Sequence, residues 1–357
     1  MHSAGTRAVH GPGTGAARAR RHGRAATRRD PARAVERLYR MREKPYSRTM
    51  TTDNASRFSA PQVAAQRRIG SLAVSPIGLG AMPFSLGKDP LPPREQAIAT
   101  VHAALDAGVT LIDTADVYAP RWDMMGHNEQ IVAEALRTWS GDASQVVVAT
   151  KGGITREKDV FPNRRNASPE YLRSAVEASL TALGVDTIDL YYWHRPDRSR
   201  RYADGVEALA ALQQEGLIRE IGVSNANVEE LDVAREVLGE GGLAAVQNEF
   251  SPRFHHTSHG ELKYCGEHGI AFVPWSPLGG IGGGSKGVGE RFLQVQRVAE
   301  LRDVSPQQVV LAWELSLGEH VIPIPGASRP ESITDSAQAM TLALSVDDLE
   351  ELATILP

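Results

Sequence analysis

Four side chains that together could give a proton to a carbonyl oxygen stand near the ends of three strand-like runs. Three apolar runs of the chain end in Asp113, in Lys151 and in His194, and Tyr118 follows the first run by five residues. Buried strands normally end in turn residues, so an ionisable group at three successive strand ends needs an explanation. In a parallel barrel the carboxyl ends of the strands meet at one mouth, where these side chains would lie together. The pattern therefore favours an enzyme.

Tyr118 is the natural proton donor of this set. An ordinary tyrosine has a pKa near 10, which is too high for efficient proton transfer at neutral pH. A nearby ammonium such as Lys151 would lower that pKa because it favours the tyrosinate. Lys151 is costly to bury alone, and Asp113 can pair with it. His194 can hydrogen-bond a substrate oxygen, so the set suits a reaction in which hydride reaches a carbonyl carbon while Tyr118 protonates the oxygen.

Each of these residues also has an ordinary structural explanation. Asp113 could cap the loop after its strand, Tyr118 could be an aromatic residue at a rim, and His194 could be a satisfied core histidine. Lys151 at a strand end is harder to explain structurally. The catalytic interpretation therefore rests on all four residues occurring together.

Alternating strand-like and helical patterns fill the chain from residue 68 onward. Residues 68–74 are predicted to form a short hairpin with a Gly-Ser turn. Ser168 and Ser305 each precede a proline, which is typical of a helix cap followed by the first helical position. Eight strand-like runs occur, at residues 77–81, 109–113, 146–150, 187–193, 219–223, 243–248, 271–275 and 321–324. Eight strand–helix units in one chain of this length favour a closed (β/α)8 TIM barrel over an open doubly wound sheet.

The composition limits the class of protein and its partners. The formal net charge is −4, so the whole chain gives no case for nucleic-acid binding. No apolar stretch is long enough to span a bilayer, so no membrane partner is expected. The single cysteine, Cys265, allows no intrachain disulfide, which suits a reducing cytoplasm. We therefore expect a cytoplasmic protein in which Cys265 is a small, buried hydrophobic residue.

Residues 1–60 differ in composition from the barrel expected over residues 61–357. They are rich in Arg, Ala and Gly, with Asp30 as the first acidic residue. Such a segment buries too little apolar surface to offset its ordering entropy, so we expect a disordered tail. Met50 reads like a second, natural start, so an alternative is that residues 1–49 are not made in the cell at all. A basic arm for nucleic acid or a membrane surface is a further alternative, whereas a targeting peptide would lack its apolar core.

Three separated segments resemble the signatures of the aldo-keto reductases. They are, in chain order, residues 111–118 (LIDTADVY), 149–153 (ATKGG) and 192–197 (YWHRPD). The resemblance is to the bacterial-type, NADP-dependent members of the family and extends from about residue 68 to residue 356. It implies a (β/α)8 barrel that binds NADP(H) in an extended pose without a Rossmann domain. It also implies that Tyr118 is the general acid of a catalytic tetrad formed by Asp113, Tyr118, Lys151 and His194.

The resemblance also implies which residues bind the cofactor. Ser224, Asn225 and Gln247 would hydrogen-bond the nicotinamide carboxamide, and Trp275 would stack on the nicotinamide ring. Ser276, Pro277 and Leu278 would line the path of the pyrophosphate. Gly326, Ser328 and Arg329 would bind the adenosine phosphate. Arg329 suits a 2′-phosphate, because a guanidinium binds phosphate well. The family usually has Glu-Asn where this chain has Asp335-Ser336, so Asp335 would hold the adenine at shorter reach. Arg329 nevertheless makes NADPH the expected cofactor rather than NADH, and no metal site is expected.

Four aromatic residues suggest the wall of a substrate pocket, namely Phe84, Trp122, Trp193 and Trp275. Trp122 belongs to an unusual loop, residues 119–128, and could instead cover a neighbouring helix. An aromatic wall would suit apolar or aromatic carbonyl compounds. The sequence does not decide between a monomer and a homo-oligomer.

The expected activity is reduction of aldehydes or ketones to alcohols with NADPH. The main alternative is a non-catalytic nicotinamide sensor or partner subunit that uses the same barrel. Such a binder would not need Lys151 and Tyr118 together. Another barrel enzyme, such as an isomerase or lyase, is a weaker alternative, because it would not need the expected carboxamide ligands.

Overall fold

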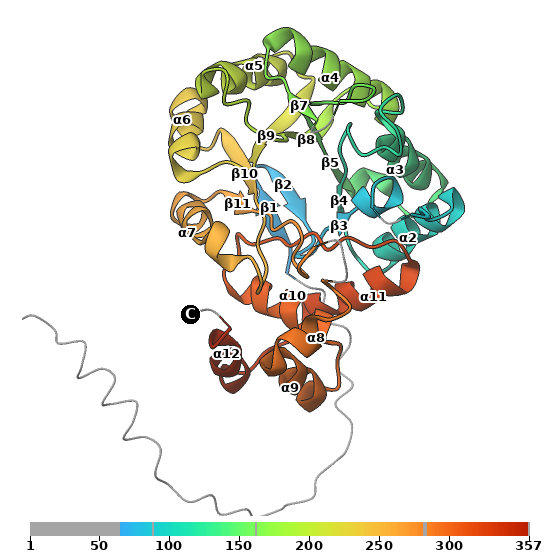
Figure 1. Cartoon of the computed structure of the whole chain (residues 1–357), viewed down its shortest axis with the longest axis vertical. Coiled ribbons are helices and arrows are strands. Elements are labelled where there is room, and N and C mark those ends of the chain that lie inside the picture. Colours follow the sequence, from blue (N-terminus) through green and yellow to red (C-terminus); the bar gives the residue numbers. More distant parts are fainter. Residues whose placement is uncertain (1–64, 88, 161–162, 281–283, 356–357) are drawn as a thin grey trace, which may run out of the picture. The chain divides into compact units, whose positions relative to one another are not determined.

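Parallel strands form a closed ring at the centre of the fold (Figure 1). Seven of them are hydrogen-bonded in the order β11-β10-β9-β8-β5-β4-β3. The segment at residues 321–326 closes the ring, since parallel bridges join Phe272 to Val321 and Gly80 to Gly326. The strands are β3 (Leu79–Gly80), β4 (Leu111–Asp113), β5 (Val147–Gly152), β8 (Ile188–Trp193), β9 (Ile218–Ser224), β10 (Leu243–Gln247) and β11 (Ala271–Phe272). The predicted barrel is confirmed.

The computed structural model describes residues 65–87, 89–160, 163–280 and 284–355. The described residues belong to one unit, Ala60–Pro357. The expected tail at residues 1–60 and the alternative start at Met50 lie outside the described residues.

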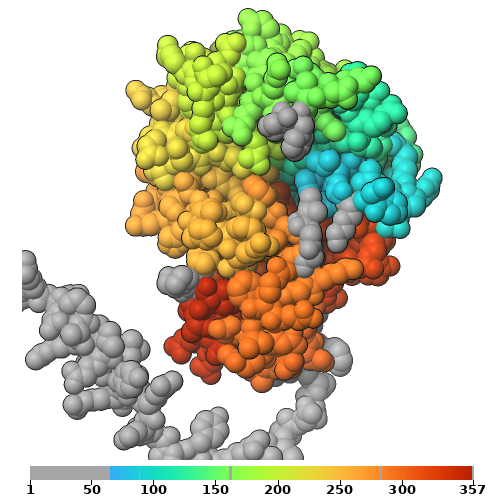
Figure 2. Space-filling model, viewed as in Figure 1, coloured from blue at the N-terminus to red at the C-terminus, as the bar shows by residue number. Residues whose placement is uncertain are grey.

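Helices surround the strands in chain order (Figure 1). Ser168 and Ser305 cap their helices as predicted, because their side chains accept hydrogen bonds from backbone N–H groups of the first turn. The helices around the ring are α2 (Arg94–Asp106), α3 (His127–Thr138), α4 (Pro169–Leu183), α5 (Tyr202–Gln214), α6 (Val228–Leu238), α7 (His259–His268), α10 (Pro306–Ser316) and α11 (Pro330–Gln338). Figures 1 and 2 show α8 (Val288–Arg291), α9 (Leu293–Arg302) and α12 (Val346–Ala353) gathered outside this ring.

The predicted hairpin closes one end of the barrel. Strands β1 (Arg67–Ile69) and β2 (Leu72–Val74) pair antiparallel. Their apolar side chains are buried in one cluster with Leu111 and Val147, the first residues of β4 and β5. The hairpin therefore covers the amino ends of the strands, and the carboxyl ends stay free for a site.

Three further observations concern single features of the described residues. Cys265 is fully buried in α7, as expected of a small hydrophobic residue. Among the helices of the described part of the chain, none is both long and apolar enough to cross a bilayer. In the same part of the chain, no group of three or more His, Cys, Asp or Glu side chains is placed to hold a metal ion.

Candidate active site

The four predicted catalytic residues meet at the carboxyl ends of three strands. Asp113 ends β4, Lys151 lies in β5, and His194 directly follows β8. Tyr118 lies in the loop after β4, where its phenol oxygen is 3.4 Å from Lys151 Nζ. The rings of Tyr118 and His194 pack edge to face with their centroids 5.7 Å apart. Parallel strand pairing thus brings together residues that are far apart in the sequence.

Lys151 is held by a full set of acceptors. Its side chain is completely buried, and Nζ donates to Asp113 Oδ1 at 2.5 Å and to the Thr114 carbonyl at 2.8 Å. The third contact is the one with Tyr118. An ammonium has three donors, so none is left unsatisfied, and this is the condition for burying it. The geometry therefore fixes the lysine beside the tyrosine hydroxyl.

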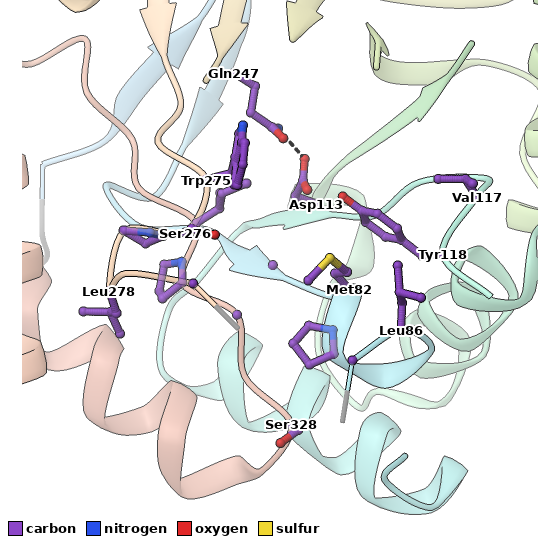
Figure 3. Close-up of a pocket in the computed structure, with 18 of the residues that line it drawn as sticks. Met82, Leu86, Asp113, Val117, Tyr118, Gln247, Trp275, Ser276, Leu278 and Ser328 are labelled. Carbon is purple, nitrogen blue, oxygen red and sulfur yellow. Dashed lines mark hydrogen bonds between the residues drawn. The ribbon is translucent and has the colours of Figure 1, made fainter. Parts of the chain in front are cut away.

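Asp113 is held from both sides. Lys151 binds Oδ1, whereas Gln247 Nε2 donates to Oδ2 at 2.7 Å, as the dashed line in Figure 3 marks. Burial raises the pKa of Asp113, and Lys151 opposes that shift. Burial lowers the pKa of Lys151, but attraction to Asp113 and Tyr118 outweighs it and the pKa is raised. Lys151 therefore remains an ammonium at neutral pH.

The pKa of Tyr118 differs from the expectation. Burial raises this pKa, and the opposing attraction of Lys151 is too weak to reverse the shift. Asp113 also raises it, because its carboxylate already offsets much of the lysine charge. The prediction of a lowered pKa is wrong for this arrangement of side chains. Tyr118 carries its proton at neutral pH, as a proton donor must.

His194 is a neutral imidazole in this site. Burial lowers its pKa well below the ordinary value, and the charges of Lys151 and Arg195 lower it further. The backbone of His194 is fixed, because its N–H donates to the Gly152 carbonyl at 2.9 Å and its carbonyl accepts from Asn225 Nδ2 at 3.1 Å. Among the described residues, none hydrogen-bonds its Nδ1. The ring can therefore donate one N–H to a ligand without carrying charge.

A cavity of about 770 Å³ opens onto this cluster. Its volume is in the range usual for small-molecule sites. Thirteen of the predicted site residues line it: Asp113, Tyr118, His194, Ser224, Asn225, Gln247, Trp275, Ser276, Pro277, Leu278, Gly326, Ser328 and Arg329. Figure 3 shows Tyr118 at one side of the cavity, with Leu278 and Ser328 far from it.

Two lining residues have strained backbones. Asn225 and Ser276 have φ values of 59° and 56°, in the left-handed region that non-glycine residues rarely adopt. Asn225 follows β9, and its side chain bonds both the His194 carbonyl and Ser224 Oγ. Such strain persists where surrounding contacts enforce it, and it is concentrated at binding sites. The loops after β9 and β11 are thus shaped around this cavity.

Three of the four residues of the expected aromatic wall do not line the cavity, whereas Trp275 does. Phe84 and Trp193 are each 1% exposed, belong to hydrophobic core clusters and do not line the cavity. Trp193 stacks on Tyr202 of α5 because alternate side chains of a strand point to opposite faces. Trp122 is 45% exposed and does not line the cavity either. These placements correct the three substrate-pocket predictions.

Asp335 is also placed differently from the expectation. Its Oδ2 accepts from Ser305 Oγ at 2.8 Å, and its Oδ1 accepts from Gln308 Nε2 at 2.6 Å. Both partners belong to the start of α10, so the carboxylate ties α11 to α10 and does not line the cavity. The prediction that Asp335 reaches an adenine is not supported by this geometry, because both of its oxygens are engaged.

Several residues that line the cavity were not predicted from the sequence. Most are loop or hairpin residues, whose directions a strand pattern does not give. They include Met82, Leu86, Gln96, Val117, Ile154, Arg156, Asn163, Arg195 and Lys286. Arg195 carried a usable signal, since it directly follows His194 at the same strand end. Met82 stands two residues from Phe84, on the side of its short helix that faces the cavity.

Comparison with known proteins gives one consistent result. The profile of the Aldo/keto reductase family matches residues 76–357. A probable aldo-keto reductase 1 of Glycine max is 33% identical over 80% of this chain and 86% of its own length. An uncharacterised oxidoreductase, C215.11c, of Schizosaccharomyces pombe is 31% identical over 80% of this chain and 88% of its own.

Solved structures agree with the sequence matches. An aldo/keto reductase of Klebsiella pneumoniae, crystallised with NADP and acetate, is 30% identical with a TM-score of 0.68. The glycerol dehydrogenase AKR11B4 of Gluconobacter oxydans is 28% identical with the same TM-score. Each comparison covers 83% of this chain and 96% of the other.

Proposed function

Because the chain belongs to the aldo/keto reductase family, we propose that it reduces aldehydes or ketones to alcohols with hydride from NADPH. Tyr118 is the general acid of this proposal. The observation that carries it is the contact between Lys151 Nζ and the Tyr118 hydroxyl, 3.4 Å apart at the edge of a cavity that His194 also lines. A binding protein would have no use for a fully buried ammonium beside a phenol.

Each residue has a distinct role in the proposed reaction. Tyr118 and the neutral His194 both donate to the carbonyl oxygen, which orients the carbonyl and polarises it. Tyr118 then gives up its proton as negative charge develops on that oxygen. Lys151 stabilises the tyrosinate that forms, and Asp113 holds the lysine in place. Bound NADPH would supply the hydride.

The lining residues fit a phosphorylated dinucleotide. Arg329 and Lys286 are cations that line the cavity, and Arg329 stands at the amino end of α11, where backbone N–H groups favour an anion. The Klebsiella pneumoniae neighbours were crystallised with NADP and with NADPH. An arginine at that end favours NADPH over NADH, because its guanidinium matches a 2′-phosphate.

The experiment compares wild type with Tyr118→Phe. NADPH absorbance is followed with a panel of aldehydes and ketones, and NADPH binding is measured separately by fluorescence. We expect the variant to lose about 10²–10⁴ of kcat/KM and to retain NADPH binding, because only the proton donor is removed.

Tyr202→Phe is the matched control. The Tyr202 hydroxyl is buried without a hydrogen-bond partner among the described residues, and it does not line the cavity. Its removal should leave turnover unchanged within about twofold. Equal turnover by Tyr118→Phe and wild type would refute the proposed role. Tight NADPH binding without turnover of any carbonyl would favour the sensor or partner-subunit alternative.

A further inference from the structure

Arg195 is a cavity residue with an unused guanidinium. It directly follows His194 and is half-buried at the cavity. Among the residues that the structure describes, none forms a hydrogen bond or an ion pair with its side chain. The neighbouring Arg156 differs, because its Nη1 donates to the Ala119 carbonyl at 2.5 Å and so supports the loop that carries Tyr118. A half-buried arginine normally has a partner, so Arg195 has binding capacity left for a ligand.

The charges around Arg195 leave this end of the cavity positive. Burial and repulsion by Arg165 lower the pKa of Arg195, while Tyr118 and Glu249 oppose that shift. The guanidinium nevertheless stays charged, since an arginine does not lose its proton in proteins. Asp113 is the one acidic side chain among the described residues of the cavity wall, and Lys151 already pairs with it. The described part of the wall therefore holds no unpaired acid, and Glu249, which attracts Arg195 electrostatically, does not line the cavity.

Part of the wall beside Tyr118 is aliphatic. Met82, Leu86 and Val117 surround the tyrosine in Figure 3, and Ile154 lines the same cavity. Such a wall suits a short hydrocarbon chain rather than a polyhydroxylated one. A ligand that contacts Tyr118, the aliphatic wall and Arg195 together would have a carbonyl at Tyr118, a few carbon atoms along the wall and an anionic group at Arg195.

We propose that Arg195 binds a carboxylate of the substrate, so that the preferred substrates are oxo acids with the carboxylate a few carbon atoms from the reacting carbonyl. One guanidinium fork matches a carboxylate through two parallel hydrogen bonds. A phosphate dianion would need several donors, and part of the Arg156 guanidinium is already engaged with the backbone. Arg195 is thus a residue that determines specificity.

This inference rests on the proposed reductase function, and the reaction itself is unchanged. Two electrons and a hydrogen nucleus pass as hydride from NADPH to the carbonyl carbon, and a proton passes from Tyr118 to the oxygen. The products are a hydroxy acid and NADP⁺, and solvent returns the proton to the tyrosine. The carboxylate is neither formed nor consumed.

The test compares one acid with its neutral ester. Steady-state rates with NADPH are measured for 4-oxobutanoate and for methyl 4-oxobutanoate, using wild type, Arg195→Gln and Arg253→Gln. Arg253 is the matched control: like Arg195 it interacts with Glu249, but it does not line the cavity. Both substitutions remove one positive charge, so a general electrostatic effect would appear in both.

We expect wild type to prefer the acid by about tenfold or more in kcat/KM, since hydrogen bonds between charged groups are stronger than neutral ones. Arg195→Gln should bring this ratio close to one, mainly through a higher KM for the acid. The ester carries no carboxylate, so a change in its turnover reports the effect of the lost charge on the tetrad, and the acid-to-ester ratio removes that effect. Arg253→Gln should keep the wild-type ratio.

A wild-type ratio near or below one would overturn the inference, and so would a ratio that survives in Arg195→Gln. Reduction of neutral aldehydes without preference for acids would leave the reductase proposal standing and overturn this one alone. If no carbonyl is reduced, the reductase proposal fails, and calorimetry with NADP⁺ present still tests the anion site. Butanoate should then bind wild type more tightly than butanamide does, and Arg195→Gln should remove the difference. Equal binding of the two would overturn the inference.

Discussion

Two buried carboxyl groups, Asp113 and Glu314, have opposite surroundings. Asp113 at the barrel mouth is 4% exposed, and both of its oxygens are hydrogen-bonded, one to Lys151 and one to Gln247. Glu314 in α10 is fully buried, and neither of its oxygens has a hydrogen-bond partner among the described residues. The Asp113 carboxyl is therefore fully satisfied, whereas the Glu314 carboxyl is not.

The surroundings also set the charge of each group. Burial raises both pKa values, but only Asp113 has a cation beside it that opposes the shift. Burial alone raises the pKa of Glu314 well above its ordinary value, so this side chain is a neutral acid in the folded chain. A buried charge is maintained where the chemistry of the site uses it. In α10 the Glu314 carboxyl keeps its proton, which reduces the free-energy cost of burying it.

Removing Lys151 should have the largest effect. Lys151→Met leaves Asp113 buried without its cation and Tyr118 without its ammonium. We expect a loss of about 3–5 kcal/mol in the free energy of unfolding. The variant should also lose at least about 100-fold in kcat, because a preorganised charge at the reacting centre is gone. Urea denaturation and NADPH-dependent turnover measure the two effects.

The double variant Lys151→Met with Asp113→Asn separates the two effects. The carboxamide that replaces the Asp113 carboxylate in that variant is neutral, so most of the lost stability should return while kcat stays at least about 100-fold below that of wild type. A double variant as unstable as Lys151→Met would show that the buried charge of Asp113 is not the cause.

Replacing Glu314 should have the opposite and smaller effect. Glu314→Leu removes a buried, unsatisfied acid, so we expect a gain of about 1–3 kcal/mol in the free energy of unfolding. Above the ordinary pKa of a glutamate, the Glu314 carboxyl loses its proton in the unfolded chain but keeps it in the folded chain. The free energy of unfolding of wild type therefore falls as the pH rises from that ordinary pKa toward the raised pKa of the folded chain. The gain from Glu314→Leu should therefore grow with pH. Urea denaturation at pH 5 and at pH 8 checks this, and a gain that shrinks with pH would contradict it.

Removing a solvent-exposed ion pair should have the smallest effect on the free energy of unfolding. Arg94 of α2 and Glu134 of α3 form a salt bridge of 2.5 Å, with side chains 40% and 32% exposed. Glu134→Gln should change the free energy of unfolding by about 0.2–1 kcal/mol and leave turnover unchanged. If Glu134→Gln changed the free energy of unfolding as much as Lys151→Met does, burial would not be what distinguishes the Arg94–Glu134 pair from the Lys151–Asp113 pair. Urea denaturation in low and high salt measures the difference.

Much of the site was predictable because it follows from strand periodicity. Apolar runs give the strands, and a parallel barrel brings their carboxyl ends to one mouth, so Asp113, Lys151 and His194 had to converge. The cofactor residues came from resemblance, and Ser224 at the end of β9 and Ser276 in the loop after β11 do line the cavity. Their roles toward NADPH stay predictions that the binding measurements test.

The aromatic wall could not be predicted in the same way. Trp193 and His194 are consecutive, yet one packs against α5 and the other lines the cavity. The type of a residue does not predict toward which face of the sheet its side chain points. At a strand end the regular alternation of side chains stops, so the pattern of the strand does not predict it either. Phe84 and Met82 differ for the same reason, since a short helical turn directs them to different sides.

The sequence by itself determined the barrel, the order of its strands and the identity of the residues at its mouth. It did so because periodicity and strand ends are local properties of the chain. Only the tertiary structure decided that the pKa of Tyr118 is raised, that Asp335 is bound to α10 and that none of the described residues binds the Arg195 side chain. These properties depend on desolvation and on contacts between residues distant in the sequence, which exist only once the barrel has closed.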